Sequence, residues 1–200
     1  MRCFFWGKNA KTQQDDHSGI SNVSYLSLKS IPMKNKHITV RIEEYDSEGE
    51  LPSGDRELLE QAKKAAENAY APYSEFHVGA AVMLKNGKII KGANQENSAY
   101  PSGLCAERVT LFQAKSRFPE TLIESLAITA NTSIFDLDHP VTPCGACRQV
   151  IAEVEGRQNH KIRIIMQGSS GPVYISEGIE NLLPLMFKEE KLKRSKSNRK

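Results

Sequence analysis

The chain has 200 residues, 39% of them hydrophobic, which is enough for one domain with a sizeable core. No apolar run approaches the roughly 18 residues needed to cross a membrane, and the first residues lack the apolar segment of a secretory signal. Three of the four cysteines fall in one candidate metal cluster, which excludes a disulfide framework and predicts a reducing, cytoplasmic compartment.

The net charge of +3 conceals a difference between the body and the end of the chain. The last ten residues contain six cations and no acid: Lys191, Lys193, Arg194, Lys196, Arg199 and Lys200. Taking these six charges from the total leaves −3 on residues 1–190. A basic run can bind nucleic acid or a membrane, but a short polar run is more typical of a solvated, disordered tail, which we predict for 189–200. We therefore expect neither nucleic acid nor a membrane as a partner.

Two predicted segments precede the main domain. Residues 1–32 are polar and unpatterned, so we expect a disordered extension or sequence upstream of the natural start. Ile38, Val40 and Ile42 alternate with polar residues, which predicts an extra, half-exposed strand within 33–50 that could pair with a sheet edge.

The main domain is expected over residues 51–188, and it begins with a helix and a hairpin. Apolar residues recur with helical spacing from Leu58, and the helix should end near Ala71, because Pro72 disfavours a helical residue before it. Predicted strands then flank Asn86-Gly87, a pair that supplies the positive φ angles of a tight hairpin.

Later elements alternate between helix and strand. Residues 93–103 should form a loop before a helix over about 105–116, whose predicted buried side carries Val109, Leu111 and Phe112. The remaining elements are expected at 126–130 (strand), from about 144 (helix), 162–166 and 173–175 (strands) and through 182–183 (short helix). This alternation predicts a three-layer α/β/α sandwich, in which the initial hairpin makes the sheet mixed.

The chemistry centres on three thiols. Cys144 and Cys147 are three residues apart, so at the start of a helix both sulfurs lie on one face of its first turn. Cys105 is the third candidate ligand. Zinc prefers tetrahedral thiolate and imidazole ligands, and three protein ligands leave the fourth position for water, which is the catalytic arrangement. The cysteines therefore predict one reactive Zn²⁺ per chain.

Two charged neighbours complete the candidate site. Glu107 follows Cys105 by two residues, and its side chain is long enough to reach a water at the metal, so we predict a general acid/base. Three thiolates would leave a net charge of −1 on the zinc core, and helix N-termini would offset it. Arg108 can also donate to a thiolate, and Arg148 is a further candidate because of its proximity in the sequence.

Simpler interpretations stay open. The cysteines could form a structural zinc knot completed by His139 or His160, although such a site has no use for Glu107. Tyr100 and Phe187 could be core or interface residues. Glu96 and His77 could be an ordinary surface acid and an ordinary strand residue.

Five motifs occur in a characteristic order between about Leu58 and Phe187. They are Y-A-P-Y-S at 70–74 with Phe76 and V-G-A-A at 78–81, N-Q-E-N at 94–97, Y-P-S-G-L-C-A-E-R at 100–108, P-C-G-A-C-R-Q-V at 143–150 and L-L-P at 182–184. On these residues the chain resembles the small zinc-dependent cytidine deaminase family, of the three-cysteine, homotetrameric type. The cysteine and acid signature is that of zinc nucleobase deaminases.

The resemblance implies hydrolytic deamination of cytidine and deoxycytidine to uridine and deoxyuridine in pyrimidine salvage. Glu107 would carry the proton from water to the ring nitrogen and then to the leaving ammonia, and Arg108 would contact the thiolates. Substrate binding is implied for Phe76, Asn94, Glu96, Tyr100, Ala106 and Phe187. Phe187 would stack on a pyrimidine in its own or a neighbouring site of a homotetramer.

Two classes of function compete at this stage. One is an enzyme for free nucleosides, with a near relative that deaminates an aminopyrimidine-containing antibiotic; the other is a zinc-dependent nucleic-acid binder or editor that uses the basic tail. The sugar motif at Asn94 and Glu96 favours the first, because a carboxylate beside the 3′ position would repel a strand phosphate. Ammonia release from cytidine distinguishes them.

Overall fold

The computed structural model describes residues 33–192. The chain divides into one unit at Met1–Lys36 and another at His37–Lys200. The described part of the first unit, 33–36, has no helix or strand. The predictions for residues 1–32 and for the tail from 193 onward lie outside the described residues.

The second unit is built on one six-stranded sheet. Its strands are β1 (Glu43–Tyr45), β2 (His77–Leu84), β3 (Ile89–Ala93), β4 (Ile123–Asn131), β5 (Arg163–Gln167) and β6 (Val173–Glu177), in the order β1-β6-β5-β4-β2-β3. Strands β4 and β5 are parallel, and all other neighbours are antiparallel. The prediction of a mixed sheet is confirmed.

Three α-helices cover the sheet: α1 (Ser53–Ala66), α2 (Ala106–Arg117) and α3 (Gly145–Gln158). Short 3₁₀ turns occur at η1 (Glu48–Glu50), η2 (Tyr100–Ser102), η3 (Ile179–Asn181) and η4 (Glu190–Leu192). None of the helices in residues 33–192 has the length and apolar character needed to cross a membrane.

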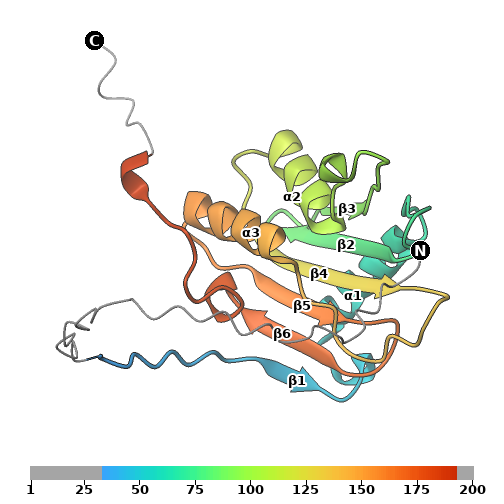
Figure 1. Cartoon of the computed structure of the whole chain (residues 1–200), viewed down its shortest axis with the longest axis horizontal. Helices are drawn as coiled ribbons and strands as arrows, with labels where there is room; N and C mark the ends of the chain where they lie inside the picture. Colours follow the sequence, from blue (N-terminus) through green and yellow to red (C-terminus); the bar gives the residue numbers. More distant parts are fainter. Residues whose placement is uncertain (1–32, 193–200) are drawn as a thin grey trace, which may run out of the picture. The chain divides into compact units, whose positions relative to one another are not determined.

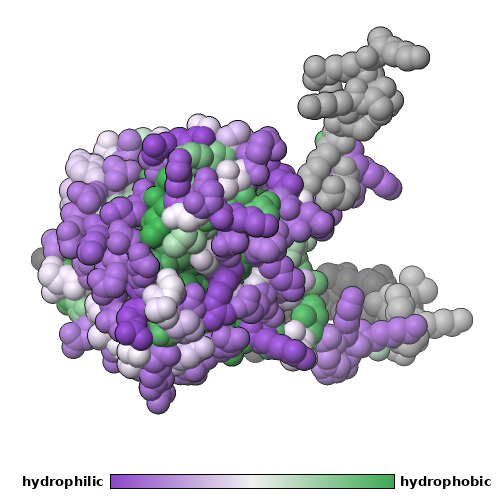
Figure 2. All heavy atoms as spheres, turned by 180° about the vertical axis from the view of Figure 1, so that it is seen from behind, coloured by the Kyte–Doolittle hydropathy of each residue, from purple (hydrophilic) through white to green (hydrophobic). Residues whose placement is uncertain are grey.

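The helices lie on both faces of the sheet, as Figure 1 shows. On the face of α1, Leu58 and Leu59 pack with Ala81, Ala127 and Ile165 of the strands. The next residues along the strands point to the other face, where they pack against α2 and α3. Each fully buried Leu or Ile contributes about 1.5–3 kcal/mol, so two buried faces stabilise a central sheet. The predicted three-layer sandwich is confirmed. Seen from the side of α1, the surface is mainly hydrophilic with smaller hydrophobic areas (Figure 2).

Two glycines set how closely the helices approach the sheet. A Cβ atom on Gly79 of β2 would lie 2.0 Å from the carbonyl oxygen of Ala62 in α1. A Cβ atom on Gly92 of β3 would lie 2.6 Å from Thr110 Oγ1 in α2. Neither position has room for a side chain, so the glycines bring the helix backbones directly onto the strands.

Helix α1 ends at Ala66, so the prediction that it continues to near Ala71 is wrong. The N–H of Ala69 bonds the carbonyl of Ala66, three residues back, which closes the last turn more tightly than an α-helix. Tyr70 then forms a parallel bridge with Gln95. A long-range backbone partner therefore ends a helix that the local pattern would have continued.

The hairpin at Asn86-Gly87 is confirmed, but its turn differs from the expected one. Only Gly87 of the pair has a positive φ, 79°. Leu84 N–H bonds the Lys88 carbonyl at 2.9 Å, and Gly87 N–H bonds the Leu84 carbonyl at 2.8 Å. The connection is thus a three-residue loop closed by a left-handed glycine rather than a two-residue turn.

The buried face of α2 also differs from the prediction. Leu111 is buried as expected, whereas Phe112 is 51% exposed and Val109 is only partly buried. The helix instead turns small residues, Thr110 and Ala114 among them, towards the sheet. Small side chains allow the close approach at β3, and an apolar-residue pattern does not detect them.

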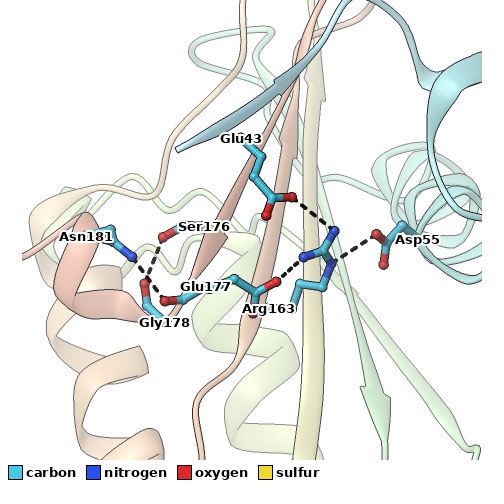
Figure 3. Close-up of polar contacts among 7 residues, drawn as sticks. All are labelled: Glu43, Asp55, Arg163, Ser176, Glu177, Gly178 and Asn181. Carbon is cyan, nitrogen blue, oxygen red and sulfur yellow. Dashed lines mark hydrogen bonds and ion pairs between the residues drawn. The ribbon is translucent and has the colours of Figure 1, made fainter. Parts of the chain in front are cut away.

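A strand within residues 33–50 pairs with the sheet edge, but it begins only after the alternating residues 38–42 that suggested it. Strand β1 covers Glu43–Tyr45 and pairs with β6, and the alternating residues 38–42 before it form no ladder. Arg163 of β5 holds this edge in place. Its guanidinium contacts Asp55 of α1 at 3.0 Å, Glu43 of β1 at 3.5 Å and Glu177 of β6 (Figure 3).

Candidate active site

The three cysteines meet at the N-termini of two helices. Cys105 and Cys144 are the N-cap residues of α2 and α3, and Cys147 lies in the first turn of α3. All three sulfur atoms lie within 4.8 Å of one another, and the Cys105 and Cys144 sulfurs are 3.9 Å apart. The prediction that Cys144 and Cys147 open a helix is confirmed, and so is the helix that begins next to Cys105.

This cluster fits a tetrahedral zinc ion. With Zn–S bonds of about 2.3 Å, the tetrahedral angle separates two sulfur ligands by about 3.8 Å. The observed 3.9 Å between Cys105 and Cys144 agrees, and thiols are the donors that zinc prefers. Neither His139 nor His160, considered as a fourth ligand, belongs to the cluster.

The thiols differ in acidity. A hydrogen bond from Cys147, together with donation from Arg108, lowers the pKa of Cys105 to about 5. The same hydrogen bond and burial raise the pKa of Cys147. Of these two sulfurs, Cys105 is the one that favours the thiolate form, and the N-terminus of α2 favours its negative charge.

Two arginines lie near the cluster and play different parts. Arg108 donates through Nη2 to the Cys105 sulfur at 3.8 Å and to the Gly103 carbonyl at 3.3 Å. Arg148, the further candidate, donates instead to the carbonyls of Pro143 and Leu182, each at 2.7 Å. Arg148 therefore holds the loop before Cys144 and does not contact sulfur.

Glu107 is buried beside the thiols. Its side chain belongs to the first turn of α2, and the residue is only 4% exposed. Burial raises the pKa of this carboxyl, and the negative charge of Cys105 raises it further. A carboxyl group whose pKa is shifted towards neutrality can both accept and donate a proton at working pH.

A cavity of about 640 Å³ opens over this corner of the molecule. Its lining includes Cys105, Cys144, Glu107 and Arg108. Four of the predicted substrate residues also line it: Phe76, Asn94, Glu96 and Tyr100. Its volume is typical of small-molecule sites.

Glu96 and Asn94 are fixed by hydrogen bonds to the segment that follows α1. The Glu96 carboxylate accepts from the Ser74 hydroxyl at 2.5 Å and the Tyr73 N–H at 2.9 Å. The Ser74 bond, followed by the Tyr73 bond, lowers the pKa of Glu96. The Asn94 side chain accepts from Val78 N–H at 2.9 Å and donates to a backbone carbonyl. Both groups are thus oriented by this one segment.

Two predicted substrate residues lie elsewhere. Ala106 is fully buried in the core beneath the cavity, where only its backbone could serve a ligand. Phe187 is 68% exposed and does not line the cavity of its own chain. Its backbone is held by the Gln149 side chain, which donates to the Phe187 carbonyl at 2.9 Å and accepts from the Phe187 N–H at 3.3 Å.

The sequence argument missed Ser74 as the group that orients Glu96. It also missed Phe135, whose ring stacks on Phe76 with centroids 6.4 Å apart. Phe135 comes from the loop before Cys144, and neither periodicity nor spacing indicates that this loop returns to Phe76. The one sequence signal for Ser74 was its place at the end of the Y-A-P-Y-S motif, next to Tyr73.

Comparisons with known proteins agree with this geometry. The family described as "Cytidine and deoxycytidylate deaminase zinc-binding region" matches residues 52–160. A cytidine deaminase of Halalkalibacterium halodurans is 41% identical over 133 residues, which are 66% of this chain and 93% of the relative. One of Sporosarcina psychrophila is 42% identical over 135 residues, 68% and 92% of the two chains.

Solved structures extend the likeness to the fold. The crystal structure of cytidine deaminase from Burkholderia pseudomallei has 37% identity and a TM-score of 0.57, over 66% of this chain and 97% of that one. The cytidine deaminase from Mycobacterium tuberculosis has 30% identity and a TM-score of 0.51, over 66% and 96%. The family match over more than half of the chain, the identity to these relatives and the shared fold together show that this chain belongs to the cytidine and deoxycytidylate deaminase family.

Proposed function

We propose that this protein is a zinc-dependent cytidine deaminase that converts cytidine and deoxycytidine, with water, to uridine and deoxyuridine and ammonia. The observation that carries the proposal is the buried Glu107 in the same cavity as the three-thiol cluster and Glu96. The reaction belongs to pyrimidine salvage, and we assign it to the cytoplasm because the cysteine cluster requires reduced thiols.

One zinc ion per chain would be held by Cys105, Cys144 and Cys147. Bound there, zinc supplies Lewis-acid chemistry and lowers the pKa of water, which is the nucleophile of the reaction. Arg108 holds positive charge against the Cys105 sulfur and so offsets the charge of the thiolates.

Glu107 moves the protons. It accepts the first proton from the attacking water and delivers it to the ring nitrogen next to C4. It then accepts the second proton from the hydroxyl now on C4 and delivers it to the amino group, which leaves as ammonia while C4 becomes a carbonyl. Burial suits Glu107 to this exchange, because a carboxyl with a raised pKa gives up and recovers a proton more readily than an exposed one.

The sugar binds at the other side of the cavity. Glu96 accepts from ribose hydroxyls with the lone pairs that Ser74 and Tyr73 leave free, and Asn94 lies beside it. Phe76 and Tyr100 form walls of the pocket, and Ala106 offers backbone groups. In the homotetramer that we propose, Phe187 reaches the pyrimidine of its own or a neighbouring site.

The substrate is a free nucleoside. In a polynucleotide the 3′ oxygen carries a phosphate, which the negative charge of Glu96 repels. Residues 1–190 carry a net charge of −3, whereas enzymes that act on strands use a positive groove.

Ammonia release from cytidine, deoxycytidine and a short single-stranded oligonucleotide tests this proposal, at low and moderate salt. We expect turnover of both nucleosides and none of the oligonucleotide. Oligonucleotide turnover that survives moderate salt, or that disappears when residues 191–200 are removed, would replace the nucleoside assignment with that of a strand-editing enzyme.

A further inference from the structure

The segment before β1, residues 38–42, has a strand-like sequence pattern but forms no strand in the structure. Residues 38–42 alternate apolar and polar side chains, yet among residues 33–192 only β6 pairs with β1, so the other side of β1 is an open sheet edge. Ile38 and Val40 are 47% and 46% exposed. In Figure 1 this blue segment runs on from β1 in the same direction.

One hydrogen bond sets the direction of its backbone groups. Arg41 N–H donates to Asn181 Oδ1 at 3.0 Å, and the Asn181 amide donates to the Glu177 carbonyl at the end of β6, at 3.0 Å. The Asn181 side chain thus accepts the Arg41 N–H in place of a backbone carbonyl of β6; Figure 3 shows its bond to Glu177. In an extended chain neighbouring residues point their backbone groups to opposite sides, so those of Val40 and Ile42 face away from β6.

The sequence around Val40 is self-complementary for antiparallel pairing. With Val40 opposite Val40 of a second copy, Ile38 lies opposite Ile42 of that copy. The same register places Lys36 opposite Glu44 of the second copy. Apolar side chains and opposite charges are the cross-strand pairs that stabilise antiparallel strands.

The register also has the correct parity. The backbone N–H and C=O groups that face away from β6 belong to the even-numbered residues. In this register, even-numbered residues of the two copies lie opposite one another. A two-fold axis through Val40 therefore lets both copies exchange N–H···O bonds at 38, 40 and 42. A register shifted by one residue would direct the apolar side chains to the opposite face.

We propose that residues 36–44 form an isologous antiparallel strand pair with the same segment of a second copy of this chain, which joins two six-stranded sheets across their β1 edges. This surface is separate from the active-site cavity, none of whose lining residues precedes Tyr73. The pairing satisfies the free backbone groups of the edge and covers Ile38, Val40 and Ile42.

Disulfide trapping tests the register in the full-length chain carrying Cys3→Ser. Opposed residues in a hydrogen-bonded antiparallel pair have Cα atoms about 5.5 Å apart, within disulfide range, whereas diagonal neighbours are about 7–8 Å apart. Mild oxidation should cross-link Val40→Cys into a covalent dimer and leave Thr39→Cys, at a neighbouring residue that is also exposed, as single chains on a non-reducing gel.

A mass measurement provides the second test. Val40→Glu places two like charges directly opposite each other on the two-fold axis, whereas Val40→Thr keeps a β-branched side chain there. By light scattering, we expect Val40→Glu to halve the particle mass and Val40→Thr to leave it unchanged, both with wild-type activity. Equal cross-linking at positions 39 and 40, no cross-linking at 40, or an unchanged mass for Val40→Glu would each overturn the proposal.

Discussion

Replacing Glu107 with Gln isolates proton transfer from the other tasks of the site. The amide keeps the size of the side chain but cannot cycle a proton, and Glu107 is only 4% exposed, so solvent has little access to take its place. The other carboxylate of the cavity is Glu96, whose pKa is lowered by Ser74 and Tyr73 and which is therefore a poor proton donor.

The expected loss is large and confined to turnover. General acid–base catalysis contributes about 10²–10⁴-fold, so Glu107→Gln should lower kcat by about 10²-fold or more, which corresponds to about 2.7 kcal/mol of transition-state stabilisation. Zinc content should stay near that of the wild type, because Glu107 is not one of the clustered thiols. KM for cytidine should change by only a few-fold.

The assay is steady-state cytidine deamination with metal analysis of the same sample. Glu124→Gln is the matched control, because Glu124 is an exposed carboxylate on β4, and it should keep wild-type kcat. If zinc-loaded Glu107→Gln retained kcat within about three-fold of the wild type, Glu107 would not be the proton carrier.

Three further outcomes are expected. Chelation should remove zinc and lower the melting temperature, because metal-binding energy is also folding energy; an unchanged melting temperature in metal-free protein would contradict this. Gly79→Ala should cost about 1–3 kcal/mol, because its Cβ would lie 2.0 Å from the Ala62 carbonyl, whereas Gly156→Ala, with nothing within 4 Å, should stabilise α3 by about 0.5–1 kcal/mol in thermal unfolding. Equal effects of the two substitutions would show that α1 does not pack on β2 in this way. Ser74→Ala should raise KM several-fold with little change in kcat, because Ser74 orients Glu96; a fall in kcat alone would refute a sugar-side role.

Much of the local structure follows from the sequence. The C-x-x-C spacing predicts that Cys144 and Cys147 open a helix, and Asn86-Gly87 predicts a hairpin. The alternation of helices and strands predicts the layered sandwich with a mixed sheet. These features depend on hydrogen bonds and side-chain periods within a few residues, so a single stretch of chain contains the information.

Long-range packing decided the rest. The end of α1 depends on Tyr70 finding Gln95, and the buried face of α2 depends on the close approach at Gly92. Phe135 meets Phe76 only because the β4–α3 loop returns over the cavity.

The sequence by itself determined which residues can bind zinc and carry a proton, because thiol and carboxyl chemistry belongs to each side chain. The tertiary structure decided that Cys105 lies 3.9 Å from a sulfur 39 positions away, and that Glu107 is buried beside it. Distance and burial change the pKa values of both groups, and they depend on how the sheet holds two helix N-termini against each other.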